Sequence, residues 1–554
     1  MIHRKYTYRT LAHSLVFFSL CMGSACSKPT PIAEPPVAAV AIVQGDVRYQ
    51  DKEYSQAGFS DVSTPTYKPV RFALVELLDA AGQVVQTSST DATGHFTFAS
   101  TARSALIGGK LRILAKTDVS SGISVEIQNM TGNLFAVTLP LTESDIEHGI
   151  TADIGLAGSV SGAFNITDVY TLGAEFVHTL NTTYPPKLTV YWQPGNASPT
   201  AYCAVGNTNT YVCPRGAGIY VYNDNAQGDT DEYDDDVLWH EYGHFVAANF
   251  FRDDSPGGCH LLTSDDLDLR LAWSEGWGDF FPTAIKSWLV ANNSKALSTP
   301  LDLSASYYID TAVTGVRIAV DIENPNGDNS DDPYMFATNE LAVANVLWRL
   351  TKNFGLERVW SIVKNHMSGA NGAANLESFW KGWKDNLAIQ SYDLSISQRI
   401  FDDRKIYYKE DLFEDDDVPR ATRVIASGVE EQHYLYKNTG VGDVDTLILK
   451  ATKGAGYTVE TYGLRNGADT LLRIKDSSGN LLVENDDFNN THYVFDRTCG
   501  GYRYQNTTTS LASKLEFLPL NDGDYTVEIS NTADPSPYPS TGRFGSYQLM
   551  VTPQ

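Results

Sequence analysis

The sequence predicts a multidomain α+β protein in which a largely helical central domain is flanked by two antiparallel β-sandwich domains. Short apolar runs alternate with turn residues from about residue 39 to 155 and again from 411 to 554. Longer amphipathic runs fill the segment between them, and two of these carry clustered histidine and carboxylate side chains. A chain of 554 residues with 42% hydrophobic residues is long and apolar enough for about three packed domains.

The first 26 residues have the pattern of an export signal. Arg4 and Lys5 precede an apolar stretch from residue 11 to 22, and small residues follow it up to Cys26. Two outcomes stay open: cleavage that releases a freely secreted protein, or attachment of a lipid to Cys26, as in bacterial lipoproteins. Gly23 departs from the lipoprotein pattern, which usually has leucine there. Residues 27–38, which are rich in Ser, Lys and Pro, would form a tether, and we expect a protein that is secreted or lipid-anchored at the bacterial cell surface or outer membrane.

The net charge limits the classes of partner that the protein can bind, and the cysteines predict disulfide bonds. A formal net charge of -26 argues against nucleic acid and against a polybasic membrane contact. No later apolar run approaches about 18 residues, so we expect membrane contact only through a lipid on Cys26. Exported proteins oxidise their cysteines. Cys203 and Cys213 would close a short loop, whereas Cys259 and Cys499 either pair across domains or remain free.

The central domain contains a sequence pattern that predicts a metal site. Residues 231–251 predict an amphipathic helix that includes His240-Glu241-Tyr242-Gly243-His244. Side chains four residues apart share a helix face, so both imidazoles can bind one zinc ion, with Glu241 beside the open position. A catalytic zinc takes three protein ligands and a water. Glu275, on a second predicted helix at 273–290, is the candidate third ligand.

The same two helices predict a reaction. Asp279 follows Glu275 by one helical turn and could accept the far N–H of a ligand histidine, although acids near helix starts are also common on surfaces. Zinc lowers the pKa of a bound water, and Glu241 can accept its proton as the hydroxide attacks a carbonyl. This chemistry hydrolyses peptides without a covalent intermediate. The alternative, that both histidines are ordinary surface residues, requires the two motifs and their order to be a coincidence.

These motifs resemble those of the gluzincin metalloproteases, the thermolysin-like clan. The residues from Glu275 to Phe281, EGWGDFF, are especially similar to the fungalysin branch, whose helix carries Glu-Gly-Trp-Ser-Asp-Phe. The resemblance covers residues 160–400 in the order of motifs, and it is strong in the two helices. It implies an α+β zincin (gluzincin) peptidase domain at residues 156–410 with one Zn²⁺ per chain. It also implies the roles of five residues: zinc ligation by His240, His244 and Glu275, general base for Glu241, and orientation of His240 for Asp279.

One part of the fungalysin pattern is missing. Members of that branch carry a histidine in a polar segment just before a later helix, where it can stabilise the oxyanion. The similar helix here, at residues 339–350, is preceded by residues 333–338, PYMFAT, which contain no histidine. Tyr334 could supply a phenolic donor, although a tyrosine at a helix start more often packs. The residue that stabilises the oxyanion therefore stays undetermined.

The flanking segments resemble accessory modules of exported proteins. Residues 39–155 look like carboxypeptidase-regulatory or transthyretin-like sandwiches, and residues 411–554 resemble the bacterial pre-peptidase C-terminal domain, a β-sandwich that accompanies secreted proteases. Just before the zinc motif, residues 216–222 predict a strand whose edge an extended peptide could join. Calcium could bind the oxygen-rich loop at 321–332 or Asp486 and Asp487, where a solvated loop and a turn are the alternatives.

Two functions from different classes follow. The favoured hypothesis is an exported zinc endopeptidase that acts on proteins or peptides. The alternative is a cell-surface adhesion or binding protein with a catalytically inactive zinc domain, which the missing histidine supports.

Overall fold

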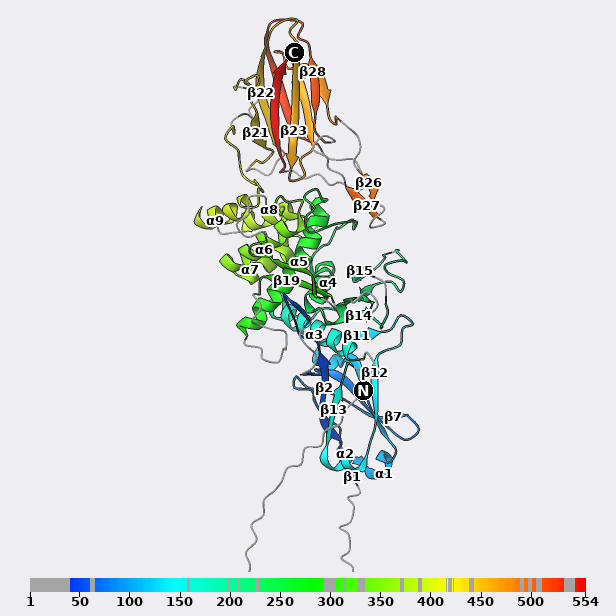
Figure 1. Cartoon of the computed structure of the whole chain (residues 1–554). Helices are drawn as coiled ribbons and strands as arrows, with labels where there is room; N and C mark the ends of the chain where they lie inside the picture. The colour runs from blue at the N-terminus through cyan, green and yellow to red at the C-terminus, as the bar shows by residue number, and fades with distance from the viewer. Residues whose placement is uncertain are drawn as a thin grey trace, which may run out of the picture.

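A computed structural model shows a multidomain α+β protein (Figure 1). The N-terminal sheets lie at one end, the helices in the middle, and the C-terminal sheets at the other end. The structure describes residues 40–554 except 60–64, 157–159, 197–198, 208, 225–228, 293–304, 313–314, 326–333, 369–372, 387–390, 415, 417–420, 422, 438–442, 489–492, 497–500, 505–510 and 533–543. The predicted export signal, the tether, Cys26, Cys499 and most of the loop at 321–332 lie outside the described residues.

Two sheets form the N-terminal region. The smaller has the order β13-β2-β5, with β8 also paired to β2, and the larger has the order β15-β16-β14-β11-β10-β6-β7, with β12 also paired to β10. The strands of the smaller sheet are β2 (Gln44–Asp51), β5 (Thr66–Pro69), β8 (His95–Thr97) and β13 (Ile150–Ile154). Those of the larger are β6 (Ala73–Leu78), β7 (Val84–Ser89), β10 (Lys110–Thr117), β11 (Val125–Gln128), β12 (Ala136–Pro140), β14 (Leu188–Tyr191), β15 (Ala201–Cys203) and β16 (Gly218–Tyr220). Both sheets are mixed, because β13 pairs with β2, and β14 with β11 and β16, in parallel. The purely antiparallel sandwich that we expected here is therefore wrong.

The larger sheet joins the N-terminal region to the central one. β11 precedes residue 155 and β14 follows it, yet the two strands pair over four residues. Strand β16 confirms a strand within residues 216–222, but it lies between β14 and β15 and is not an edge. Among the described residues, β15 is the strand at this edge of the sheet and pairs with β16 alone.

The central region is mostly helical. Its first long helix, α3 (Ser161–Asn181), packs against β10, β11 and β2 as well as α4. The two predicted motif helices are confirmed as α4 (Asp235–Phe250) and α5 (Leu269–Ala291). The later helices are α6 (Glu340–Phe354), α7 (Leu356–His366), α8 (Leu376–Asn386) and α9 (Ser391–Asp402). A hairpin of β19 (Tyr307–Ala312) and β20 (Gly315–Asp321) packs on α4 and α5.

Glycines and one buried ion pair fix the distance between the motif helices. A Cβ atom on Gly243 would lie 3.0 Å from the Phe281 side chain, so the missing side chain lets α4 and α5 approach closely. Lys286 of α5 donates to Asp236 of α4 at 2.7 Å, and both side chains are buried. Lys286 also donates to the Tyr307 carbonyl of β19. Because an unpaired charge here would be costly, this contact holds both helices and the hairpin in one arrangement.

The C-terminal region is built from two antiparallel four-stranded sheets. One has the order β21-β30-β23-β28 and the other β22-β29-β24-β25. Their bounds are β21 (Glu431–Tyr434), β22 (Val444–Ala451), β23 (Tyr457–Arg465), β24 (Thr470–Lys475), β25 (Leu481–Asn485), β28 (Lys514–Phe517), β29 (Gly523–Asn531) and β30 (Ser546–Pro553). Their buried side chains form a hydrophobic core of their own, whereas the N-terminal and central regions share a single core.

The predicted disulfide between Cys203 and Cys213 is confirmed, with an S–S distance of 2.02 Å. Cys259 is also disulfide-bonded. Cys499, with which we expected that it could pair, is not among the described residues. In the described part of the chain, none of the helices combines the length and apolar character that a membrane crossing requires.

Candidate metal centre

Three predicted ligands converge between α4 and α5. His240, His244 and Glu275 place one nitrogen or oxygen atom each within 4.8 Å of one another. The Nε2 atoms of the two histidines are 3.1 Å apart, and each lies 3.3 Å from Oε2 of Glu275. The i, i+4 spacing on α4 sets both imidazoles on one face, and α5 supplies the carboxylate from across the helix contact. Two nitrogens and one carboxylate oxygen form a donor set that fits zinc.

The outward nitrogen of each histidine has its own partner. Nδ1 of His240 lies 3.1 Å from Oδ1 of Asp279, one turn beyond Glu275. Nδ1 of His244 lies 3.2 Å from the Ser274 hydroxyl, which itself donates to Asp253 at 2.9 Å. A partner on Nδ1 fixes the tautomer that leaves Nε2 free to bind a metal. Asp279 therefore occupies the position that we expected, whereas Ser274 and Asp253 have no counterpart in the sequence analysis.

The electrostatics of the three ligands favour a bound cation. Burial lowers the pKa of His240, but hydrogen bonds to Asp279 and Glu275 outweigh it and raise this pKa to about 9. The pKa of His244 is also raised, because burial is outweighed by the charge of Glu275. Burial raises the pKa of Glu275. The nearby His260 and His244 lower it by more than burial raises it, so the pKa lies well below its usual range. These pKa shifts show that the positions of the two histidine nitrogens favour positive charge and the position of Glu275 favours negative charge.

Glu241 lies beside these ligands and points toward the sheet. Its Oε2 accepts a hydrogen bond of 2.6 Å from the backbone N–H of Tyr202 on the edge strand β15. Glu241 also lines, together with His244 and Glu275, a cavity of about 380 Å³ at the metal centre. The carboxylate thus lies between the three candidate ligands and the edge strand β15.

A histidine that the sequence analysis did not single out reaches the same cavity. His260, in the loop between α4 and α5, places Nε2 at 3.8 Å from Oε2 of Glu275. Its Nδ1 lies 2.8 Å from Oε2 of Glu340, a buried residue at the start of α6. The charge of Glu275 raises the pKa of His260 to about 10, which burial opposes and Glu340 reinforces. Neither residue belongs to a local motif, since the two are 80 positions apart; only the fold brings them together.

Tyr334 does not line this cavity. It packs, partly buried, against the hydrophobic core, and its carbonyl accepts a hydrogen bond from Arg404. The alternative that we weighed for this tyrosine, a packing role, agrees with these contacts.

Other polar clusters lie elsewhere in the described residues. Asp469, Asp486 and Asp487 come close enough to hold a cation, as do Asp411, His433 and Asp445. Binding of calcium by the first cluster stays a prediction.

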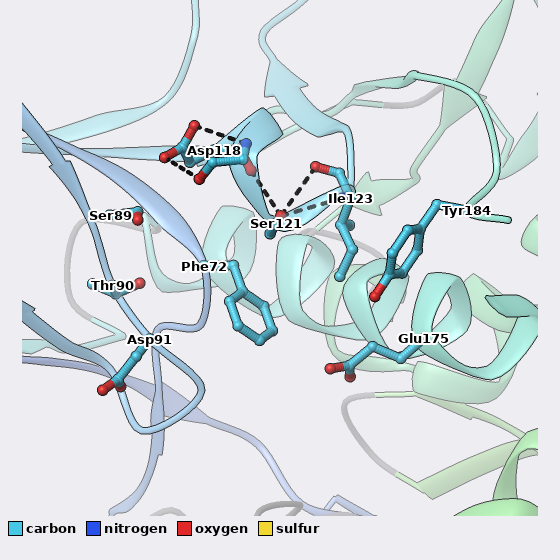
Figure 2. Close-up of a pocket in the computed structure, with 10 residues that line it drawn as sticks. Phe72, Ser89, Thr90, Asp91, Asp118, Ser121, Ile123, Glu175 and Tyr184 are labelled. Carbon is cyan, nitrogen blue, oxygen red and sulfur yellow. Dashed lines mark hydrogen bonds between the residues drawn. The ribbon is translucent and has the colours of Figure 1, made fainter. Parts of the chain in front are cut away.

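A further cavity of about 330 Å³ lies between the N-terminal sheet and α3. Figure 2 shows Phe72 and Tyr184 facing it. Its carboxylates are engaged elsewhere, because Glu175 pairs with Arg71 and Asp118 caps its own turn. Nothing in this cavity suggests a reaction.

Comparisons with known proteins leave the family open. No family model matches the chain. A curated protein of Archaeoglobus fulgidus, described as "Uncharacterized protein", is 33% identical over 121 residues, which are 22% of this chain and 28% of that protein. The chain thus matches little more than a quarter of that relative's length.

Two solved structures are similar to 24% of this chain. One is the pre-peptidase C-terminal domain of collagenase from Bacillus anthracis, with 11% identity, 98% of that structure covered and a TM-score of 0.16. The other is CorA, a surface-associated copper-binding protein of Methylomicrobium album BG8, with 10% identity, 97% covered and a TM-score of 0.14. Scores this low support no assignment of function.

Proposed function

We propose that the protein is an exported zinc endopeptidase of the gluzincin type. One observation carries this proposal: two imidazole nitrogens and a carboxylate oxygen meet within 4.8 Å beside Glu241, and Asp279 and Ser274 hold the two imidazole rings at Nδ1. Two Nε2 atoms only 3.1 Å apart cannot both direct lone pairs at each other, so a proton or a metal ion must lie between them. His240, His244 and Glu275 would hold the zinc.

The chain's own residues supply most of the mechanism. A substrate peptide lies along β15 in an extended form and is held by main-chain hydrogen bonds. Bound zinc would act as a Lewis acid toward the carbonyl and lower the pKa of a water. Glu241 accepts the proton of the attacking water and passes it to the leaving amine. Asp279 and Ser274 keep the two imidazoles in the orientation that metal binding requires.

His260 fills the role that the sequence analysis left open. Glu340 holds its Nδ1, so the protonated ring directs Nε2–H into the cavity that contains Glu241 and His244. A donor in that position can stabilise the negative charge that develops on the carbonyl oxygen. The alternative function, a binding protein with an inactive zinc domain, drew its support from the missing histidine. His260 weakens that support, because a histidine from another segment reaches the cavity.

The decisive experiment combines activity with metal content. Purified protein should hydrolyse casein, lose activity on treatment with a zinc chelator, and regain it when zinc is added back. Elemental analysis should find about one zinc per chain in the wild type, and His244→Ala should remove it. Stoichiometric zinc in the His244→Ala protein would refute the ligand assignment. A zinc-loaded wild type that cleaves no peptide would favour the binding protein.

A further inference from the structure

A second cavity lies on the other side of Glu241. It has a volume of about 620 Å³ and shares Glu241 and Thr200 with the cavity at the metal centre. Val237, one turn before His240 on α4, and Tyr308 of β19 form part of its wall. Because both cavities meet at Glu241 and at Thr200, the residue just before β15, a peptide bound along β15 can present neighbouring residues to both.

Acidic side chains gather in this second cavity. Asp229, Asp231 and Asp310 line it, and Arg317 is the basic residue among the lining residues. The three aspartates and Asp234 place an oxygen each within 4.8 Å of one another. Burial and the charge of Asp229 raise the pKa of Asp231 well above its usual range, so Asp229 and Asp310 supply most of the negative charge beside the general base.

Two buried oxygens of this cluster have no partner. Oδ1 of Asp229 and Oδ1 of Asp310 make no hydrogen bond with any residue that the structure describes. Asp229 is only 5% exposed, so water does not readily satisfy its oxygen. Burial raises the pKa of Asp310 to about 6, and Asp229 raises it further against the opposing effect of Arg317. Such groups gain most from a cationic partner that enters the cavity.

The other contacts of these aspartates help to decide whether the cavity would take calcium or a basic side chain. Asp234 already accepts from the Thr311 hydroxyl and backbone N–H, and Asp229 already binds the Arg317 guanidinium. Calcium requires six to eight oxygens, and the contacts to Thr311 and Arg317 already engage several oxygens of this cluster. A lysine or arginine head group needs only a few acceptors, and its aliphatic stem can lie against Val237 and Tyr308.

We propose that this acidic cavity is the subsite that receives a lysine or arginine side chain of the substrate, next to the bond that is cleaved. The inference rests on the proposed peptidase function and adds the class of substrate: peptides with a basic residue beside the scissile bond. Asp310 and Asp229 provide negative charge for the basic head group. Tyr308 and Val237 provide a wall along which the aliphatic stem of the side chain can lie.

The test uses quenched fluorescent peptides that differ at one residue, which is lysine, leucine or glutamate, with each cleavage position determined by mass spectrometry. The wild type should show kcat/KM about ten- to a hundredfold higher for lysine than for leucine, the range expected for a charge-assisted hydrogen bond. Asp310→Asn should remove most of this preference, through a lower kcat/KM for the lysine peptide. Asp265→Asn, an exposed aspartate that does not line the cavity, is the matched control and should keep the preference.

A binding measurement separates this inference from the proposed function. Titration of zinc-loaded Glu241→Gln protein with the lysine and leucine peptides reports the subsite without catalysis. Tighter binding of the lysine peptide that Asp310→Asn removes supports the subsite, even if the wild type cleaves nothing and the peptidase proposal fails. Equal binding and equal cleavage of both peptides would overturn the subsite while leaving the peptidase intact. Loss of one bound calcium per chain in Asp310→Asn would also overturn it, because the cluster would then be a metal site.

Discussion

Glu241 accepts its hydrogen bond from the Tyr202 backbone, and that contact keeps the carboxylate beside the three ligands without joining them. Glu241→Gln should therefore retain zinc and fold but lose the proton acceptor. We expect turnover of a quenched fluorescent peptide to fall by about a hundred- to ten-thousandfold, with little change in KM. Asp279→Ala should act more mildly, weakening zinc binding or activity by about ten- to a hundredfold. Equal turnover in wild type and zinc-loaded Glu241→Gln would rule out the mechanism.

His260 provides a second test at the level of a single residue. His260→Gln should leave zinc content unchanged and lower kcat by about a hundred- to a thousandfold, with KM almost constant, because the donor acts on the transition state. Tyr334→Phe is the control, since Tyr334 does not line the cavity. If Tyr334→Phe lowered kcat and His260→Gln did not, the phenol would be the oxyanion donor.

The raised pKa values of the ligand histidines predict how zinc binding depends on pH. Histidine binds zinc only as the neutral imidazole. The pKa of His240 is raised to about 9 and that of His244 is also raised, so protons compete with zinc for the two imidazoles. Zinc affinity should therefore rise as the pH increases from 6 to 9.

Calorimetric titration of the metal-free protein in buffers with different ionisation enthalpies measures this displacement. Near pH 7 it should report the release of roughly one to two protons per zinc. Glu241→Gln should release the same number, because it leaves both histidines intact. A binding enthalpy that does not depend on the buffer would show that no proton is released, which would contradict the prediction.

At the scale of single residues, the sequence predicted what lies on one helix and missed what the fold brings together. The i, i+4 spacing placed His240 and His244, and one helical turn placed Asp279 relative to Glu275. His260 and Glu340 come from a loop and a distant helix start, and no periodicity relates their positions. The acidic cavity is of the same kind, because Asp229 and Asp310 meet only when β19 packs near the start of α4.

At the scale of elements, glycines of α5 determine where the ligands lie. A Cβ on Gly278 would come within 2.7 Å of the His240 ring, so Gly278→Ala must push the imidazole from its position. Alanine favours a helix over glycine by about 1 kcal/mol, and any loss must come from this clash. We expect zinc affinity to fall on the order of ten- to a hundredfold, as for other losses of histidine orientation. Competition with a chromogenic chelator measures it.

Gly276→Ala is the matched control in the same helix. Its Cβ would lie 2.6 Å from the Glu340 carbonyl oxygen and 2.6 Å from the Val343 side chain, so the strain falls on the contact with α6. Urea unfolding should show a loss of about 1–3 kcal/mol, with zinc affinity retained. Equal zinc affinity in wild type and Gly278→Ala would show that His240 can be accommodated elsewhere.

The positions of helices and strands were easier to predict than the order in which the strands pair. The sequence predicted the bounds of α4 and α5 to within about four residues, and Asn339, where the predicted helix at 339–350 began, is the N-cap of α6. The edge strand was predicted wrongly, because a short strand such as β15 leaves a weak pattern and β16 has the stronger one. Apolar side chains show that a strand is buried but not which strands flank it.

At the scale of the whole molecule, sequence composition separates three regions, but the packing joins two of them. The parallel pairing of β11 with β14 crosses residue 155, and the N-terminal and central regions share one hydrophobic core. Strand pairing between distant segments leaves no local signal, so a sandwich pattern at 40–155 predicted strands without showing this continuity. The two C-terminal sheets differ from the N-terminal ones, because they pack around a separate hydrophobic core made of their own side chains.

This difference predicts opposite results for two truncations of the mature protein. A chain that begins at residue 156 would expose the edge of β14 and the face of α3 that packs on β10 and β11. We expect it to aggregate or to bind no zinc. A chain that ends at residue 410 loses the packing of Tyr436 and Phe544 in the central core, together with the hydrogen bonds of Ala337 to Asn466 and of Phe544 to Glu377. It keeps the shared sheet and all residues of the metal centre, so it should be less stable than the whole chain but still bind zinc and keep its peptidase activity. Size-exclusion chromatography with zinc analysis compares the two, and a soluble zinc-binding protein that begins at residue 156 would show that the shared sheet is dispensable for the metal centre.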